Sequence, residues 1–264
     1  MLRFYFEVAR TAFRRQLIYR WANLAGLLTN AFFGIVSSSV IIALFQARHT
    51  AGGYDLHESL RYQWLAQALV MVVLPFNWSD LMLTIRTGEV ISDLSKPCDF
   101  CWYWFSREIG RDVYYLLYRA IPTYAIGMLL FGIGVPTGWG QWSLFIAVLI
   151  LGAVLGIAFR FLCNIASFWL LEARPINGLV QNLALFFTGL FIPLPFFPAW
   201  LRAFSEWLPS NGLMNVPVQV FVGKANGGAL LFEIARQSLW LVALVVAARL
   251  LTQVATRRVV SQGG

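Results

Sequence analysis

Charged residues are scarce in this chain, and their scarcity excludes a soluble protein. Only 12% of its 264 residues are Asp, Glu, Lys or Arg, whereas 59% are hydrophobic and the mean hydropathy is +0.68. Soluble proteins average roughly 25% charged and about 45–50% apolar residues. No polar stretch is long enough to fold as a soluble domain, so the composition predicts an all-α polytopic membrane protein.

Histidine and cysteine are also rare, which leaves little for metal binding or catalysis. The two histidines, His49 and His57, lie in the same predicted external loop. The three cysteines do not suggest a disulfide framework. Cys98 and Cys101 have the spacing of a metal or redox pair, but no second pair of ligands lies on their side of the membrane. No Ser/His/Asp arrangement is visible, so we expect neither a metal site nor a catalytic site.

A phosphate-binding loop of the form G-x-x-x-x-G-K-[ST] is absent, so the chain cannot bind the phosphates of ATP by itself. A proton relay would need acids near the middle of the membrane, and none is convincing. Ionisable residues near the ends of the apolar segments have simpler expected roles. Asp80, Asp112 and Glu172 are expected beside headgroups and water, Arg119 and Arg160 to extend toward the interface, and Glu233 to pair with Arg236.

Six apolar segments are each close to the roughly 20 residues that a bilayer requires. They predict six transmembrane helices at about 22–46, 61–84, 112–134, 142–165, 177–194 and 230–252. Lys and Arg concentrate in the N-terminal arm, in the loop after the second segment and after the sixth, which predicts that both termini are cytoplasmic. The net charge of +8 follows from this asymmetry, so it gives no reason to expect a nucleic-acid partner.

The N-terminal arm, residues 1–20, is amphipathic. One helical face carries Leu2, Phe6, Ala9, Phe13 and Leu17, and arginines occupy another. This pattern predicts an interfacial helix that lies in the cytoplasmic headgroup layer, with its arginines near anionic membrane lipid. A cytoplasmic extension of the first spanning helix is the alternative.

Residues 85–97 form a short charged segment between the second and third spans. Thr87 can cap a helix start, Glu89 and Lys96 suit the helix dipole, and Pro97 ends the helix. Val90, Ile91 and Leu94 fall on one side at helical spacing. The pattern predicts a stiff helix that docks into a groove on a soluble partner, and an ordinary loop helix is the alternative. The candidate docking residues are Thr87, Gly88, Glu89, Val90, Ile91, Asp93, Leu94 and Pro97.

Residues 189–209 are too apolar for a solvated loop and too rich in proline for a spanning helix. Irregular backbone at membrane depth persists only when protein or a cavity surrounds it. We therefore expect a re-entrant external region, covering 195–229 in all, in which Phe197, Leu201 and Phe204 pack inward. An amphipathic external loop helix is the alternative.

This layout resembles the permease subunits of ABC-2 type transporters, in particular a bacterial branch with a Gly-Glu-[Val/Ile]-x-x-x-Leu-x-[Arg/Lys]-Pro segment. Here that segment is residues 88–97. The resemblance covers essentially the whole chain as a single ABC-2 transmembrane domain, 1–264. Its weaker motifs lie at 19–20, 167–174, 188–193, 197–198, 208–209, 237–240 and 262–264.

The resemblance implies a non-enzymatic permease of the bacterial inner membrane. Two such subunits, identical or related, would bind two cytoplasmic ABC ATPase subunits, which would hold the ATP and Mg²⁺ and push on the 85–97 helix. Family members are mostly exporters of drugs, lipids or glycans. A scaffold or assembly subunit that docks a cytoplasmic partner without transport is the alternative.

The resemblance also assigns the walls of the translocation path mainly to spans two and five. In span five, Asn182, Phe186 and Gly189 recur at helical spacing, so one face mixes an amide, a ring and bare backbone. Such a face suits a substrate that is partly apolar and partly polar. Close helix packing through small residues is the alternative.

Overall fold

The computed structural model describes residues 1–47, 49–73, 80–170, 172–225 and 227–257. Those residues form helices and no β-strand. The elements run in the order α1 (Leu2–Ile18), α2 (Arg20–Ala47), α3 (Leu56–Val73), α4 (Asp80–Thr87), α5 (Val90–Leu94), α6 (Phe100–Tyr115), η1 (Leu116–Ala120), α7 (Ile121–Phe131), α8 (Trp139–Ile165), η2 (Ala166–Phe168), α9 (Arg174–Phe187), η3 (Leu194–Phe196), α10 (Ala199–Trp207), η4 (Asn211–Asn215), α11 (Val216–Val222) and α12 (Gly227–Thr256).

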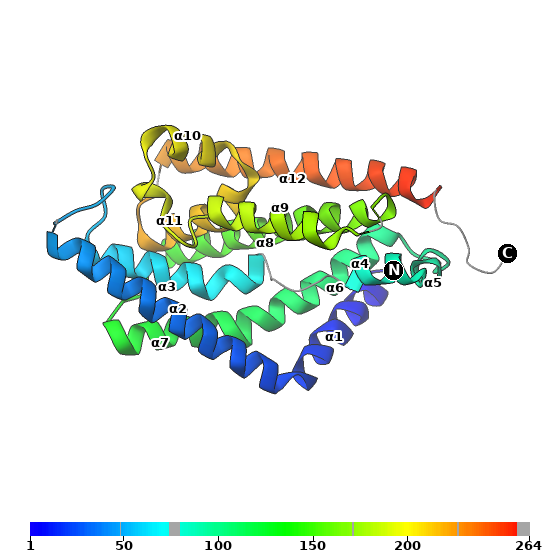
Figure 1. The fold of residues 1–264 in the computed structure, drawn as a ribbon, viewed down its shortest axis with the longest axis horizontal. Coiled ribbons are helices and arrows are strands. Elements are labelled where there is room, and N and C mark those ends of the chain that lie inside the picture. Colours follow the sequence, from blue (N-terminus) through cyan, green and yellow to red (C-terminus); the bar gives the residue numbers. More distant parts are fainter. Residues whose placement is uncertain (48, 74–79, 171, 226, 258–264) are drawn as a thin grey trace.

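The long helices form an elongated bundle whose two ends differ (Figure 1). One end, which we call the loop end, holds α4, α5, the start of α1 and the last turns of α12. The opposite end holds α10 and the connection from α2 to α3. Among the described residues, three helical stretches are long and apolar enough to cross a membrane: Arg20–Ala47, Trp139–Phe168 and Gly227–Thr256.

The helix bounds agree with some predicted segments and correct others. Helices α2, α8 and α12 correspond to the first, fourth and sixth. For the second, 61–84, the described structure gives α3 up to Val73 and α4 from Asp80, and residues 74–79 between them lie outside the described residues. The third starts about a dozen residues before its predicted bound, because the Asp99 carboxylate accepts a hydrogen bond from the Trp102 amide (2.9 Å) and caps α6 there. The predicted C-terminal motif 262–264 and residue 171 also lie outside the described residues.

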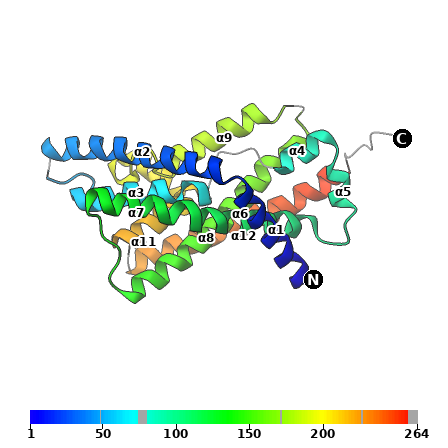
Figure 2. The same ribbon diagram turned by 90° about the horizontal axis from the view of Figure 1, so that it is seen from below.

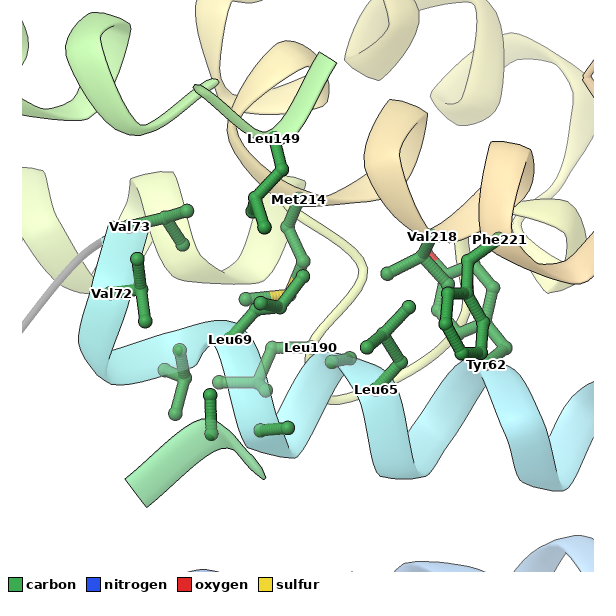
Figure 3. Close-up of a cluster of buried hydrophobic side chains, with 14 of the residues drawn as sticks. Tyr62, Leu65, Leu69, Val72, Val73, Leu149, Leu190, Met214, Val218 and Phe221 are labelled. Carbon is green, nitrogen blue, oxygen red and sulfur yellow. The ribbon is translucent and has the colours of Figure 1, made fainter. Parts of the chain in front are cut away.

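Helix α3 is the core of the bundle. All its side chains from Ser59 to Val73 are buried except that of Arg61. Figure 3 shows leucines and valines of α3 facing Leu149 of α8 and Met214 and Val218 of the η4–α11 segment. Its polar side chains find partners inside the protein: the Tyr62 hydroxyl bonds the Asn215 side chain at 2.8 Å, and the Gln63 amide donates to the Leu190 carbonyl at 3.1 Å. Because protein surrounds α3, this helix can carry more polar residues than the long helices around it.

The buried backbone between α9 and α12 falls in two stretches, most of 188–197 and then 211–222. Residues 211–222, η4 and α11, are buried apart from the partly covered Gln219. By contrast α10 is an exposed amphipathic helix, and Phe204 is 53% exposed. The inward packing predicted for Phe197 is confirmed, and Leu201 is half-buried. The inward packing predicted for Phe204 is wrong, because that side chain is exposed. The predicted region 195–229 thus contains both buried backbone, at 211–222, and the exposed helix α10.

Helix α1 turns away from α2 after Ile18 and crosses α6 (Figure 2). The two helices approach closely at Gly110, where any Cβ would collide with the carbonyl of Ala9. Phe13 contacts Tyr114 edge to face, with the ring centroids 5.7 Å apart. Only part of the predicted apolar face is therefore covered by protein: Ala9 and Phe13 contact α6, while Leu2, Phe6 and Leu17 are exposed.

Candidate functional site

The 85–97 segment is two short helices joined by a turn rather than one capped helix. Thr87 is the last residue of α4, and its hydroxyl donates to the carbonyl of Leu83 at 3.1 Å, so it does not cap a following helix. Gly88 makes the turn with φ +78, a conformation that side chains disfavour. Helix α5 then has only five residues, with Glu89 at its N-cap position and no side-chain capping bond.

The apolar edge of α5 faces the rest of the protein. Val90 is 2% exposed and packs with Leu81 and Phe100, and Leu94 is half-buried against the same cluster. Of the three apolar side chains on this edge, Val90, Ile91 and Leu94, only Ile91 is exposed, at 36%. The outer side of the turn, which we call the loop surface, consists of Thr87, Glu89, Ile91 and Ser92.

Ion pairs hold the loop segment to the bundle. Asp93 is buried and accepts from the Lys96 ammonium at 2.6 Å, and this ammonium also bonds the Tyr103 hydroxyl of α6 at 2.9 Å. In α4, Arg86 pairs with Glu172 at 2.6 Å, ahead of α9. Asp80 pairs with Arg15 of α1 at 2.6 Å and with Arg107 of α6 at 2.7 Å. A displacement of the loop would therefore pull on three other elements at once.

A buried ionic cluster lies further inside. The Arg160 guanidinium of α8 donates to Asp112 at 2.8 Å and Glu108 at 3.1 Å, both on α6, and to the Val73 carbonyl at the end of α3 at 2.7 Å. Arg111 also pairs with Glu108. Arg160 is 3% exposed, so it does not extend to the interface as the sequence suggested, and Asp112 is likewise enclosed by protein. The cluster joins three helices and gives the Val73 carbonyl a side-chain donor.

A cavity of about 860 Å³ runs beside α2. Its polar wall comes from α2, where Asn23, Gly26, Asn30 and Ser37 recur on one helical face, and from Gln67 of α3. Arg119, in the π-helical turn η1, also lines it. This cavity was not predicted from the sequence, although polar residues at helical spacing in an apolar span are a signal for it.

Comparison with known proteins identifies the family. Residues 32–263 match the family model described as ABC-2 family transporter protein. The chain belongs to the ABC-2 transporter family. A search of curated proteins gives no match. The family is a transport component of the membrane, in agreement with the all-α fold and the long apolar helices.

Within this ABC-2 domain, α9 does not present the three predicted path residues on one open face. Asn182 is exposed, and Phe186 is half-buried and stacks on Phe197 with the ring centroids 5.3 Å apart. Gly189 lies after the end of α9 in a turn with φ +84, where a Cβ would collide with the Tyr62 hydroxyl. Gly189 is therefore needed for the turn and is a correction to the predicted path face.

The two cysteines at 98 and 101 lie in different surroundings. Cys101 is buried, with its sulfur 3.6 Å from the Thr252 hydroxyl, and burial raises the pKa of the Cys98 thiol, which disfavours the thiolate that binds metals. Within the described ranges, no group of three His, Cys, Asp or Glu side chains is placed to hold a metal ion.

Proposed function

We propose that this chain is the membrane-spanning permease subunit of an ATP-driven ABC-2 exporter. Membership of the ABC-2 family is the observation that carries the proposal. In the proposed complex, the permease pairs with a second permease, and two cytoplasmic ABC ATPase subunits bind and hydrolyse ATP with Mg²⁺. The chain contains no phosphate-binding loop of its own, so the energy must come from such a partner.

In this proposal the loop surface is where the ATPase pushes. It is exposed, lies at one end of the bundle (Figure 1), and is tied by Arg86, Asp80 and Lys96 to α1, α6 and the segment before α9. Force applied to such a braced turn would be passed to several helices instead of being lost in a flexible loop. Asn182, exposed on α9, stays part of the proposed path.

A scaffold subunit would use the same loop without transport. The cavity beside α2 favours transport, because a pure scaffold gains nothing from a large space among its helices that is lined by both polar and apolar side chains. The deciding experiment is purification of the chain from its native membrane, followed by an ATPase assay on the proteins that accompany it. An ATPase with a phosphate-binding loop, active and stimulated by the permease, is expected; a partner without ATPase activity would favour the scaffold.

The proposed orientation places the loop end in the cytoplasm of a bacterial cell, at its inner membrane. After Cys98, Cys101 and Cys163 are replaced, cysteines introduced at exposed His57 and exposed Ser92 report the two sides. A membrane-impermeant maleimide should label His57→Cys in intact cells and label Ser92→Cys only after lysis, because Lys and Arg concentrate on the loop side. Labelling of Ser92→Cys from outside would reverse the orientation.

A further inference from the structure

Arg119 stands out because its charge is buried without a counterion. It is 7% exposed, and none of the acidic side chains in the described structure pairs with it. Its guanidinium donates a hydrogen bond to the Asn30 side chain at 3.3 Å and lies 5.8 Å from the centre of the Tyr115 ring. Its Nε has no hydrogen-bond partner.

Arg160 shows what a satisfied arginine looks like in the same bundle. It meets two carboxylates and a carbonyl, whereas Arg119 meets one amide oxygen. A buried cation without a partner is costly, and in a spanning segment it marks a functional site more often than a structural one. A π-helical turn, a feature frequent at functional sites, carries Arg119. Packing alone therefore does not explain this residue.

Helix α2 leaves room for the Arg119 guanidinium at the cavity wall. The Arg119 guanidinium packs directly against Gly26 of α2, where a Cβ would force the arginine side chain to move. Asn30 and Gln67 add polar groups to the cavity wall next to Arg119, and Phe33, Val70 and Met71 add apolar surface. A cavity of about 860 Å³ is within the usual range for organic ligands. The other charged groups of the wall are paired, Arg15 with Asp80 and Arg111 with Glu108. In the described structure the wall therefore offers Arg119 as an unpaired cation with apolar contacts beside it.

We propose that this cavity binds an amphiphile through its anionic head group, with Arg119 and Asn30 holding the anion and Phe33 and Met71 contacting the apolar part. Calling the ligand a transported substrate rests on the proposed function, but the binding site does not. A phosphate, sulfate or carboxylate would each supply the missing counterion. Its oxygens would accept hydrogen bonds from the N–H groups of Arg119 that have no partner.

Binding is measured with radiolabelled dodecyl phosphate on the purified full-length chain in dodecyl maltoside, whose tail is the same length but whose head group is neutral. Wild type should bind the probe saturably. Arg119→Gln should weaken binding about tenfold or more, because it removes a charge-assisted contact. Arg119→Lys keeps the charge and should retain most of the affinity. Arg202→Gln, on exposed α10, is the matched control and should bind like wild type.

Asn30→Asp is the sharper variant because it leaves Arg119 in place. The new carboxylate would stand within hydrogen-bond reach of the guanidinium and act as an internal counterion. It should therefore abolish probe binding while the chain melts at the same temperature or higher. If both Asn30→Asp and Arg119→Gln bind dodecyl phosphate as tightly as wild type, the proposal is wrong.

Two further measurements distinguish a resident membrane lipid from a transported substrate as the source of the anionic head group. Displacement of the probe by phosphatidylglycerol, with no ATP-dependent movement of the probe in vesicles containing the co-purified ATPase, identifies a resident lipid. ATP-dependent movement that Asn30→Asp stops identifies a substrate. Both results support the anion site, whereas an inactive or absent ATPase with intact probe binding contradicts only the proposed transport function.

Discussion

Replacing Arg160 by methionine should destabilise the protein by about 3–5 kcal/mol, because removal of one partner leaves buried carboxylates without a counterion. Asp112 would lose its closest cation, Glu108 would keep only Arg111, and the carbonyl of Val73 would lose its donor. Thermal or denaturant unfolding of the detergent-purified chain measures the change.

Two companion variants show whether the charge or the shape of Arg160 matters. The double variant Arg160→Met with Asp112→Leu removes both charges and should recover a large part of the lost stability. Arg202→Met removes an exposed cation 3.9 Å from Glu206 and should change stability by less than about 1 kcal/mol. Equal melting temperatures for wild type and Arg160→Met would show that the cluster does not hold the helices together.

The parts of the fold that the sequence predicts well are those where one physical requirement dominates. Helices α2 and α12 face outward over much of their length, so they must be long and apolar, and their runs are visible directly. Helix α3 is different because protein surrounds it. The Gln63 amide bonds the Leu190 carbonyl and Gln67 lines the cavity beside α2, and hydropathy alone placed the start of α3 at 61 rather than at Leu56.

The candidate site was predicted less well because its geometry depends on contacts between distant residues. Periodicity put Val90 and Leu94 on one side of a helix, but it could not tell that this side faces Leu81 and Phe100. Helical spacing also continued past the end of α9 to Gly189, although the chain already turns there. The distance of 48 residues between Asp112 and Arg160 likewise hides their pairing from any local pattern.

The loop surface gives the largest expected effect on activity. Glu89→Lys reverses the charge of an exposed side chain at the start of α5, and Ile91→Asp places a charge on the exposed apolar position. If the ATPase binds there, each change should weaken its association about tenfold or more, because a mismatched charge at an interface costs several kcal/mol. Transport and permease-stimulated ATP hydrolysis should fall together, while the melting temperature of the isolated permease stays unchanged.

Two control variants test whether the effect depends on the loop surface itself. Val90→Asp, one residue away, would bury a charge in the cluster around Leu81 and should lower the amount of folded permease rather than uncouple it. Glu206→Lys makes the same charge reversal on exposed α10, at the opposite end of the bundle (Figure 1), and should leave ATPase binding intact. Glu89, Val90 and Ile91 are adjacent in sequence. A difference between the effects of their substitutions on ATPase binding therefore reflects which way each side chain faces. Full ATPase binding and transport in both Glu89→Lys and Ile91→Asp would show that the partner docks elsewhere.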